Sequence, residues 1–286
     1  MIGFDRWLLP STATRQSVRL SATNPDLWVF SQPYYDLVGR RLVYTPTGQL
    51  LAGITYRVEL ADPSQDVNGL GFYAYDRAPL DVGSFPARYV FRTRAAVDHA
   101  AEGTKLVTCK NVLELFSGAG CSGAACHITR SSSNCAGQGG ASGYDSLLER
   151  CVPVPRAGLD LSTAEGLLAS IGRTARSADS SEQSGKTLAS SERFGLGMPL
   201  IDPGRPENSM MMYRLLLGAD AYRDASFRFV VEPPDPAELD RASDWFGSIG
   251  PMPPEQTGWP TSASPIAVVR ALQAWIEQGA DGSACQ

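Results

Sequence analysis

Two cysteines and a histidine stand together in the run Cys121-Ser-Gly-Ala-Ala-Cys126-His127. The chain has six cysteines and only two histidines, so this grouping constrains the fold more than any other sequence feature. Two thiols followed directly by an imidazole are what a covalently attached haem requires, because the cysteines form thioethers with the haem and the histidine ligates its iron. The run therefore predicts a site for one haem. The alternative is a small disulfide, or two unrelated bridges, with His127 at the surface.

The composition of the chain excludes several kinds of partner. The 286 residues are 43% hydrophobic, which suits one large domain or two ordinary ones. The formal net charge is −5 and no block of lysine and arginine is present, which argues against nucleic acid, since phosphate binding needs clustered cations. No apolar run approaches the roughly 18 residues that span a bilayer, so we expect no transmembrane segment.

The cysteines favour an oxidising compartment, because six of them occur without a repeated C-x-x-C spacing. Covalent haem attachment also takes place outside the cytoplasm. The start of the chain, Met1 to Arg6, lacks the basic and then apolar pattern of a signal peptide. We therefore expect a periplasmic, cell-surface or extracellular protein, associated with the cell envelope, whose signal or anchor segment lies upstream of this chain.

Residues 1–96 form a series of short runs rich in β-branched and aromatic residues, separated by turn residues. Strands are predicted at 17–20, 28–30, 41–44, 55–60, 71–75 and 89–93. Short strands at this interval predict a β-sandwich. With Phe4-Asp-Arg6, Tyr44-Thr-Pro46 and Phe91-Arg-Thr93, the segment resembles the bacterial Ig-like domain of S-layer and other surface proteins. The resemblance implies a spacer or adhesion module. Asp62 and Asp66, beside an Asn-Gly turn, are interpreted as turn residues rather than calcium ligands.

Residues 97–286 carry helical patterns instead. A short helix is expected around 112–116, just before the Cys121 run, and another begins at the capping box Ser162-Thr-Ala-Glu165. A third includes Met212, and the last runs from the cap Ser264 to Gly279, with one apolar stripe. Ser- and Gly-rich insertions are expected at about 129–157 and 173–192.

Four short motifs follow the Cys121 run in a fixed order: Gly158-Leu-Asp-Leu161, Pro203-Gly-Arg-Pro-Glu-Asn-Ser209, Met252-Pro253 and Trp275-Ile-Glu-Gln-Gly-Ala280. In this order the segment resembles the single-haem cytochrome c-like domain of large bacterial multidomain secreted proteins. Four residues separate the cysteines instead of the usual two, a wider spacing that some c-type cytochromes have. The resemblance implies an all-α domain with long loops. The expected fold class is therefore multidomain β + α, with an Ig-like β-sandwich at 1–96 and an all-α cytochrome c-like domain at 97–286.

The resemblance also implies a methionine ligand on the distal side of the haem. Met252 is the predicted ligand, since the prolines of Gly250-Pro-Met-Pro-Pro254 restrict the backbone that holds its sulfur. Met198, also before a proline, is the alternative. Met210, Met211 and Met212 are interpreted as helix packing. His99 is expected to be exposed to solvent.

The other four cysteines allow three pairings. The resemblance favours Cys109 with Cys285, which would join the first and last helices, elements that cross in cytochromes c. Cys135 with Cys151 would then close the polar insertion. Both bridges are interpreted as structural.

These features together predict an electron carrier rather than an enzyme. No nucleophile elbow, H-E-x-x-H, Walker or dinucleotide motif is present. If His127 and Met252 both ligate iron, no position remains for a substrate, and the expected function is outer-sphere electron transfer to a redox protein or an extracellular acceptor. The main alternative is a haem-free, disulfide-stabilised interaction or structural protein of the cell surface. A third possibility keeps the cytochrome fold without haem.

Overall fold

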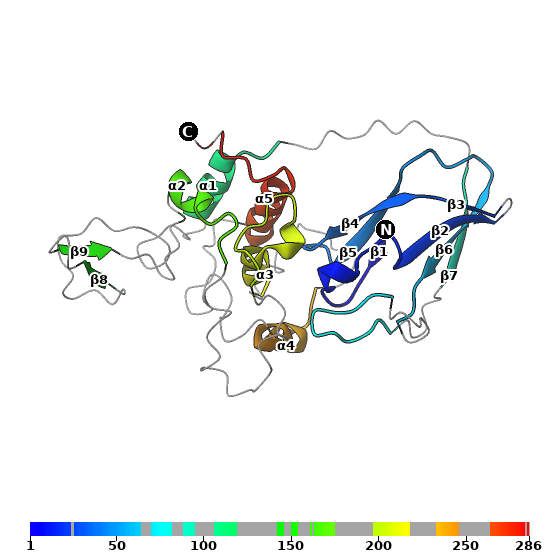
Figure 1. The fold of residues 1–286 in the computed structure, drawn as a ribbon, viewed down its shortest axis with the longest axis horizontal. Helices are drawn as coiled ribbons and strands as arrows, with labels where there is room; N and C mark the ends of the chain where they lie inside the picture. The colour runs from blue at the N-terminus through cyan, green and yellow to red at the C-terminus, as the bar shows by residue number, and fades with distance from the viewer. Residues whose placement is uncertain are drawn as a thin grey trace. The chain divides into compact units, whose positions relative to one another are not determined.

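The structure is a computed structural model that describes residues 1–23, 26–63, 70–81, 88–94, 106–118, 142–145, 150–153, 161, 163–174, 197–217, 233–245, 264–283 and 285. The chain divides into two compact units (Figure 1). The first unit comprises Met1–Thr104 together with Phe229–Trp245, and the second comprises Lys105–Arg228 together with Phe246–Gln286. The first unit therefore recruits a segment from the far half of the sequence, which a division at residue 96 does not anticipate.

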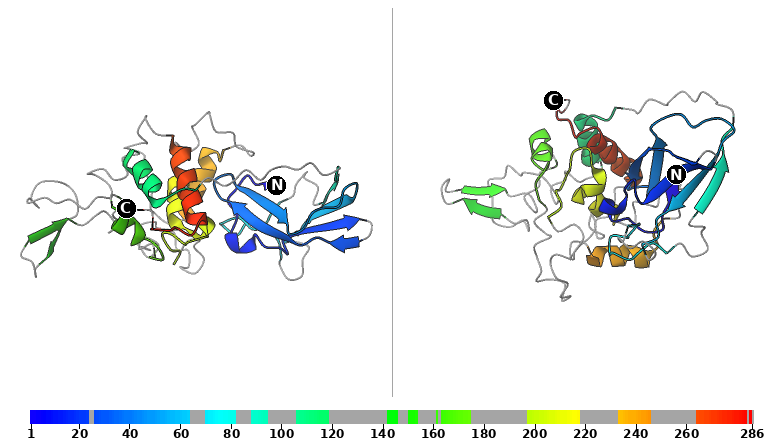
Figure 2. Two further views of the ribbon diagram at one scale, coloured as in Figure 1. Left: turned by 90° about the horizontal axis from the view of Figure 1, so that it is seen from above. Right: turned by 45° about the vertical axis from the view of Figure 1, so that its right-hand side comes forward.

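Two antiparallel sheets build the first unit. The three-stranded sheet has the order β1-β5-β4, with β1 at Ile2–Gly3, β4 at Ser31–Asp36 and β5 at Arg41–Pro46. The four-stranded sheet has the order β3-β2-β6-β7, with β2 at Val18–Thr23, β3 at Asp26–Trp28, β6 at Thr55–Leu60 and β7 at Arg88–Arg92. Apolar side chains from both sheets line a common space, and Figure 2 shows the two sheets as neighbouring layers.

Most of the strands lie where β-branched and aromatic residues predict them. The runs at 17–20, 41–44, 55–60 and 89–93 correspond to β2, β5, β6 and β7. The run at 71–75 does not form a strand; there the structure has only the isolated bridges between Leu8 and Ala74 and between Tyr73 and Pro79. The prediction of a strand at 28–30 is largely wrong, because β3 ends at Trp28 and the next strand begins at Ser31.

The helix α4 (Pro236–Trp245) belongs to the first unit, where charged side chains connect it to the β segment. Asp235 Oδ1 accepts a hydrogen bond of 2.7 Å from the backbone amide of Glu238, which begins the helix. The Glu238 carboxylate accepts hydrogen bonds from Arg6 Nε at 3.2 Å and from Arg241 at 2.7 Å. Arg6 also contacts Asp76 at 2.5 Å, and its guanidinium lies 5.2 Å from the centre of the Tyr75 ring. This ionic cluster fixes α4 in the unit.

Short helices form most of the described part of the second unit. They are α1 (Cys109–Gly118), α2 (Ala164–Leu168), α3 (Met210–Leu216) and α5 (Pro265–Glu277), with a 3₁₀ turn, η5, at Pro206–Asn208. The helix α5 packs against α1 and α3, and α1 also contacts α2. Val112 and Phe116 from α1 are buried, as are Leu272, Trp275 and Ile276 from α5. These side chains form the core of the unit.

Two features of the helices confirm the sequence patterns and two correct them. The apolar stripe of α5 is buried, and Gly279 ends the helix with a φ of 94°, a conformation that glycine adopts at little cost. Ser264 occupies the N-cap position of α5, but its side chain makes no capping hydrogen bond. The cap of α2 is Thr163, whose side chain accepts from the amide of Gly166 at 3.1 Å, rather than the predicted Ser162.

The expected fold class, an Ig-like β-sandwich followed by an all-α cytochrome c-like domain, is wrong. The described part is mixed, with small antiparallel sheets and short helices, and it contains no clear all-α cytochrome domain. Inside the predicted helical half, β8 (Ser142–Asp145) pairs antiparallel with β9 (Arg150–Pro153), and Ile171 forms a parallel bridge with Ile201. The composition of 129–157 suggested only a polar loop, yet an antiparallel ladder needs only backbone amides and carbonyls in register.

Candidate functional site

The predicted haem residues Cys121, Cys126, His127 and Met252 lie outside the described residues. The same holds for His99, Asp66 and Cys135, and therefore for the predicted pairing of Cys135 with Cys151. The backbone of Cys151 belongs to β9, opposite Tyr144. The structure thus describes the segments that flank the predicted haem site.

The helix α1 leads directly to the first cysteine of the predicted site. It ends at Gly118, and Cys121 follows within three residues. The helix begins at a local hydrogen-bonded motif in which the Thr108 side chain and the Asn111 side chain each accept from the other's backbone amide, at 3.3 and 3.0 Å. Just before it, the amide of Val107 donates to the side chain of Gln278 at 3.1 Å. Both ends of the second unit therefore meet at the start of α1.

A disulfide joins Cys109 and Cys285, the pairing that the sequence analysis favours, with a Cα–Cα distance of 4.8 Å. Cys109 is the first residue of α1 and is completely buried, and Cys285 follows α5. The bridge closes a sequence separation of 176 residues. It holds the helix before the Cys121 run against the last helix of the chain.

Met198, the alternative distal ligand, is buried in the second unit with 7% of its surface exposed. It follows Gly197, which has a φ of 73°, and precedes Pro199, whose carbonyl accepts from the amide of Met210 at 2.9 Å. The methionines at 210, 211 and 212 are each at most 1% exposed, which confirms that they serve in helix packing. The role of Met198 as a ligand stays a prediction.

The described residues do not include a binding site for a metal ion made of protein side chains. Among them, no three side chains of His, Cys, Asp or Glu lie close enough together to hold such an ion. Among the helices that the structure describes, none is long and apolar enough to cross a membrane.

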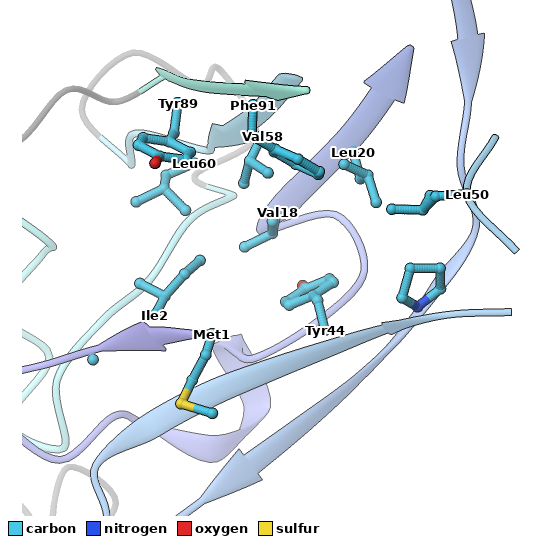
Figure 3. A pocket seen from close by; sticks show the side chains of 12 residues that line it. Met1, Ile2, Val18, Leu20, Tyr44, Leu50, Val58, Leu60, Tyr89 and Phe91 are labelled. Atoms are coloured by element: carbon cyan, nitrogen blue, oxygen red, sulfur yellow. The ribbon is translucent and has the colours of Figure 1, made fainter. Parts of the chain in front are cut away.

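The described part of the first unit contains a cavity that the sequence analysis did not predict. It has a volume of about 490 Å³ and lies between the two sheets (Figure 3). The four-stranded sheet contributes apolar and aromatic side chains from alternate positions of three strands: Val18, Leu20, Val58, Leu60, Tyr89 and Phe91. The N-terminal segment, β5 and the loop after it supply the opposite wall: Met1, Ile2, Gly3, Tyr44, Pro46 and Leu50.

The side chains that line this cavity carry no formal charge at neutral pH, because none of them is acidic or basic. The Tyr44 hydroxyl donates a hydrogen bond to the backbone carbonyl of Thr14, and burial raises the pKa of Tyr44 to about 12, so the phenol stays protonated. In the sequence, the spacing of Val18 with Leu20 and of Val58 with Leu60 indicates that each strand has one apolar face. This spacing does not indicate where the facing sheet leaves a cavity.

Comparison of the chain with protein-family models, with curated proteins and with solved structures gave no match. Its function is therefore inferred from its own residues.

Proposed function

We propose that this chain is an exported haem protein that transfers single electrons. Cys121 and Cys126 would hold one haem through thioethers, His127 would ligate the iron, and Met252 would be the second axial ligand, with Met198 as the alternative. The haem supplies a metal centre that exchanges one electron without bond rearrangement at a substrate. The proposed location is the periplasm or the cell surface, and the proposed partner is a redox protein or an extracellular electron acceptor.

One observation carries this proposal: the Cys121 run follows a helix that is anchored at its base. The disulfide and the buried side chains of Val112 and Phe116 fix α1 against α5, so the backbone enters the run from a rigid element. Rigid elements next to a cofactor site generally favour binding, because they restrict the backbone that carries the ligands.

The chemistry of the residues fits a covalent haem. The donor set of two thiols, one imidazole and one thioether is complete within a single chain. The Cys109–Cys285 disulfide suits the oxidising compartment in which covalent haem attachment takes place. The buried Met198 adds a second thioether in the same unit.

The chain's own residues would set the properties of this site. A thioether ligand raises the reduction potential of haem iron relative to a second histidine. The prolines beside Met252 restrict its backbone, which lowers the entropic cost of holding the sulfur in place.

The deciding experiment is an intact mass and a visible spectrum of the chain, expressed to the periplasm of a host with c-type maturation, before and after acid-acetone extraction. The expected result is a mass gain of one haem that survives extraction. A colourless protein of unmodified mass, apart from the hydrogens lost to disulfides, would overturn the proposal.

The two histidines offer a matched control for the ligand assignment. His127→Ala is expected to abolish the low-spin spectrum, whereas His99→Ala leaves it unchanged. Met252→Ala is expected to retain the haem with a shift toward high spin and a lower potential. If Met198→Ala produces that change instead, the distal ligand is Met198.

A second candidate function is a haem-free interaction protein of the cell surface, stabilised by disulfides. The observation that favours it lies on the first unit, where Trp28 and Phe30 are 64% and 71% exposed and Leu27 beside them is 53% exposed. Contiguous exposed apolar side chains are typical of interaction surfaces. The same mass measurement separates the two candidates, because this one predicts the loss of six hydrogens for three disulfides and no haem.

A further inference from the structure

The cavity between the two sheets of the first unit lies in a different unit from the Cys121 run, and we infer that it is a binding site for an uncharged small molecule with an apolar body, such as a fatty alcohol. This inference does not rest on the proposed haem function. It rests on the size, the lining and the position of the cavity in the unit.

The size of the cavity is that of a ligand site rather than of a packing defect. Protein interiors are close-packed and hold few voids larger than a water molecule. The volume of about 490 Å³ lies within the range of roughly 300–1,000 Å³ that small-molecule sites occupy. An apolar cavity of about 150 Å³ is already large enough to bind benzene.

Part of the same sheet face is closely packed. Beside the cavity, Leu20, Ala22 and Tyr56 form a buried cluster on which Phe91 and Ile54 pack. The rings of Tyr56 and Phe91 stack with centroids 5.7 Å apart. Cross-strand register then places Val18 opposite Leu60 and Leu20 opposite Val58, on the part of the face that borders the cavity. The cavity therefore borders a packed cluster, and Leu20, Val58 and Phe91 take part in both.

The lining selects an apolar ligand. In Figure 3 the side chains of Leu60 and Ile2 point toward one another from opposite sheets, with the space between them unfilled. At the base of the cavity, Val18 and Leu20 are 3% and 7% exposed. A hydrocarbon chain in this space would remove its own surface and that of both walls from water, which is the main favourable term in such binding.

The polar groups at the cavity select an uncharged ligand. A carboxylate or ammonium group would lose its hydration without gaining a side chain of opposite charge, since no lining side chain is charged. The Tyr44 hydroxyl already donates to Thr14. The Tyr89 side chain is 60% exposed, so its hydroxyl is within reach of solvent and of the polar end of a ligand. One hydroxyl or carbonyl on the ligand suits this arrangement.

Equilibrium dialysis of the full chain against N-phenyl-1-naphthylamine, a neutral apolar probe, tests the inference. The probe is quantified after extraction, so a bound haem does not affect the readout. We expect one saturable site per chain, competition by 1-decanol, and little competition by decanoate. Absence of saturable binding, or equal competition by decanoate, would overturn the inference.

Two variants that fill the cavity from opposite walls locate the site. Leu60→Trp and Ile2→Trp are each expected to weaken probe binding about tenfold or more, because a larger side chain occupies the space. Leu51→Trp is the matched control, since Leu51 is 62% exposed and does not line the cavity. Circular dichroism verifies that each variant is folded. Equal probe binding in a folded filling variant and in Leu51→Trp would overturn the assignment of the site.

A second copy of the chain is the competing occupant of the cavity. If the affinity for the probe falls as protein concentration rises, and light scattering shows association over the same range, the cavity is a self-association surface and the small-molecule inference is wrong. Unchanged affinity across that range supports a small-molecule site.

Discussion

Different interactions stabilise the interior of each of the two units of this chain. In the first, the strands of two sheets pair by backbone hydrogen bonds at many points, and an ionic cluster adds α4. In the second, short helices pack through apolar side chains, and one disulfide links the start of α1 to the segment after α5. The comparison indicates that many weak contacts stabilise the first unit, whereas the described part of the second combines apolar packing with a covalent link.

The largest expected effect is therefore the loss of the disulfide. The double variant Cys109→Ser and Cys285→Ser should lower the free energy of unfolding of the second unit by about 4–5 kcal/mol, because a loop of this length gains much entropy when unfolded. Hydrogen exchange should accelerate in peptides from 109–118 and 265–277 and stay unchanged in β2 and β6. This contrast measures the stability of each unit separately.

Reduction of the native chain serves as the control for that variant. A reductant should reproduce, in the native protein, the faster exchange of 109–118 and 265–277 that the double variant shows. An equal acceleration in β2 and β6 would contradict the view that the bridge stabilises the second unit alone.

A smaller effect is expected from the ionic cluster of the first unit. Arg6→Ala removes the contacts of Arg6 to Asp76, Glu238 and Tyr75. The Glu238 carboxylate, 6% exposed as a residue, then keeps Arg241 as its ion-pair partner. We expect a loss of about 2–3 kcal/mol in the stability of the first unit, since breaking one partner of a partly buried ion pair leaves a charge poorly compensated. Exchange of the amides in 236–245 should rise first.

Arg241→Ala is the matched control for Arg6→Ala. Arg241 contacts the same carboxylate at 2.7 Å, but its side chain is half exposed, so solvent screens the interaction. Its removal should cost roughly 0–1 kcal/mol. If the two variants have the same effect, burial of Arg6 does not determine how firmly α4 is held.

The sequence allowed more of the secondary structure to be predicted than of the tertiary arrangement. Four of the strands and the last helix follow from local periodicity, because alternation and the 3.6-residue stripe are properties of short segments. The helix α4 was missed although Asp235, Pro236 and Glu238 form a recognisable start, with an N-cap, a proline in the first turn and an acidic residue. Its place in the first unit depends on Arg6, more than 230 residues away, which no local pattern encodes.

The candidate sites show the same limit. The pairing of Cys109 with Cys285 was expected only through a resemblance, since spacing alone left three pairings open. The cavity was not predicted, because its existence depends on how two sheets separate and not on any one strand. The fold class was wrong for a related reason: the backbone pairing of β8 with β9 gives no signal in a segment rich in serine and glycine.

The smallest expected effect compares one tryptophan from each unit. Trp7 and Trp275 are at most 1% exposed. Trp275 Nε1 donates to the carbonyl of Asp281 at 3.0 Å, whereas Trp7 Nε1 has no hydrogen-bond partner within the described ranges. The change to phenylalanine removes the same side-chain volume at both positions, both of which are fully buried. Trp275→Phe also loses a hydrogen bond, whereas Trp7→Phe removes a buried indole N–H that has no partner within the described ranges. We therefore expect Trp275→Phe to lower the free energy of unfolding of the second unit by about 1 kcal/mol more than Trp7→Phe lowers that of the first, as measured by hydrogen exchange in each unit.

An equal loss of stability at both positions would mean that the hydrogen bond of Trp275 adds no net stability. The described contacts of the second unit that stabilise it would then be its disulfide and its apolar packing.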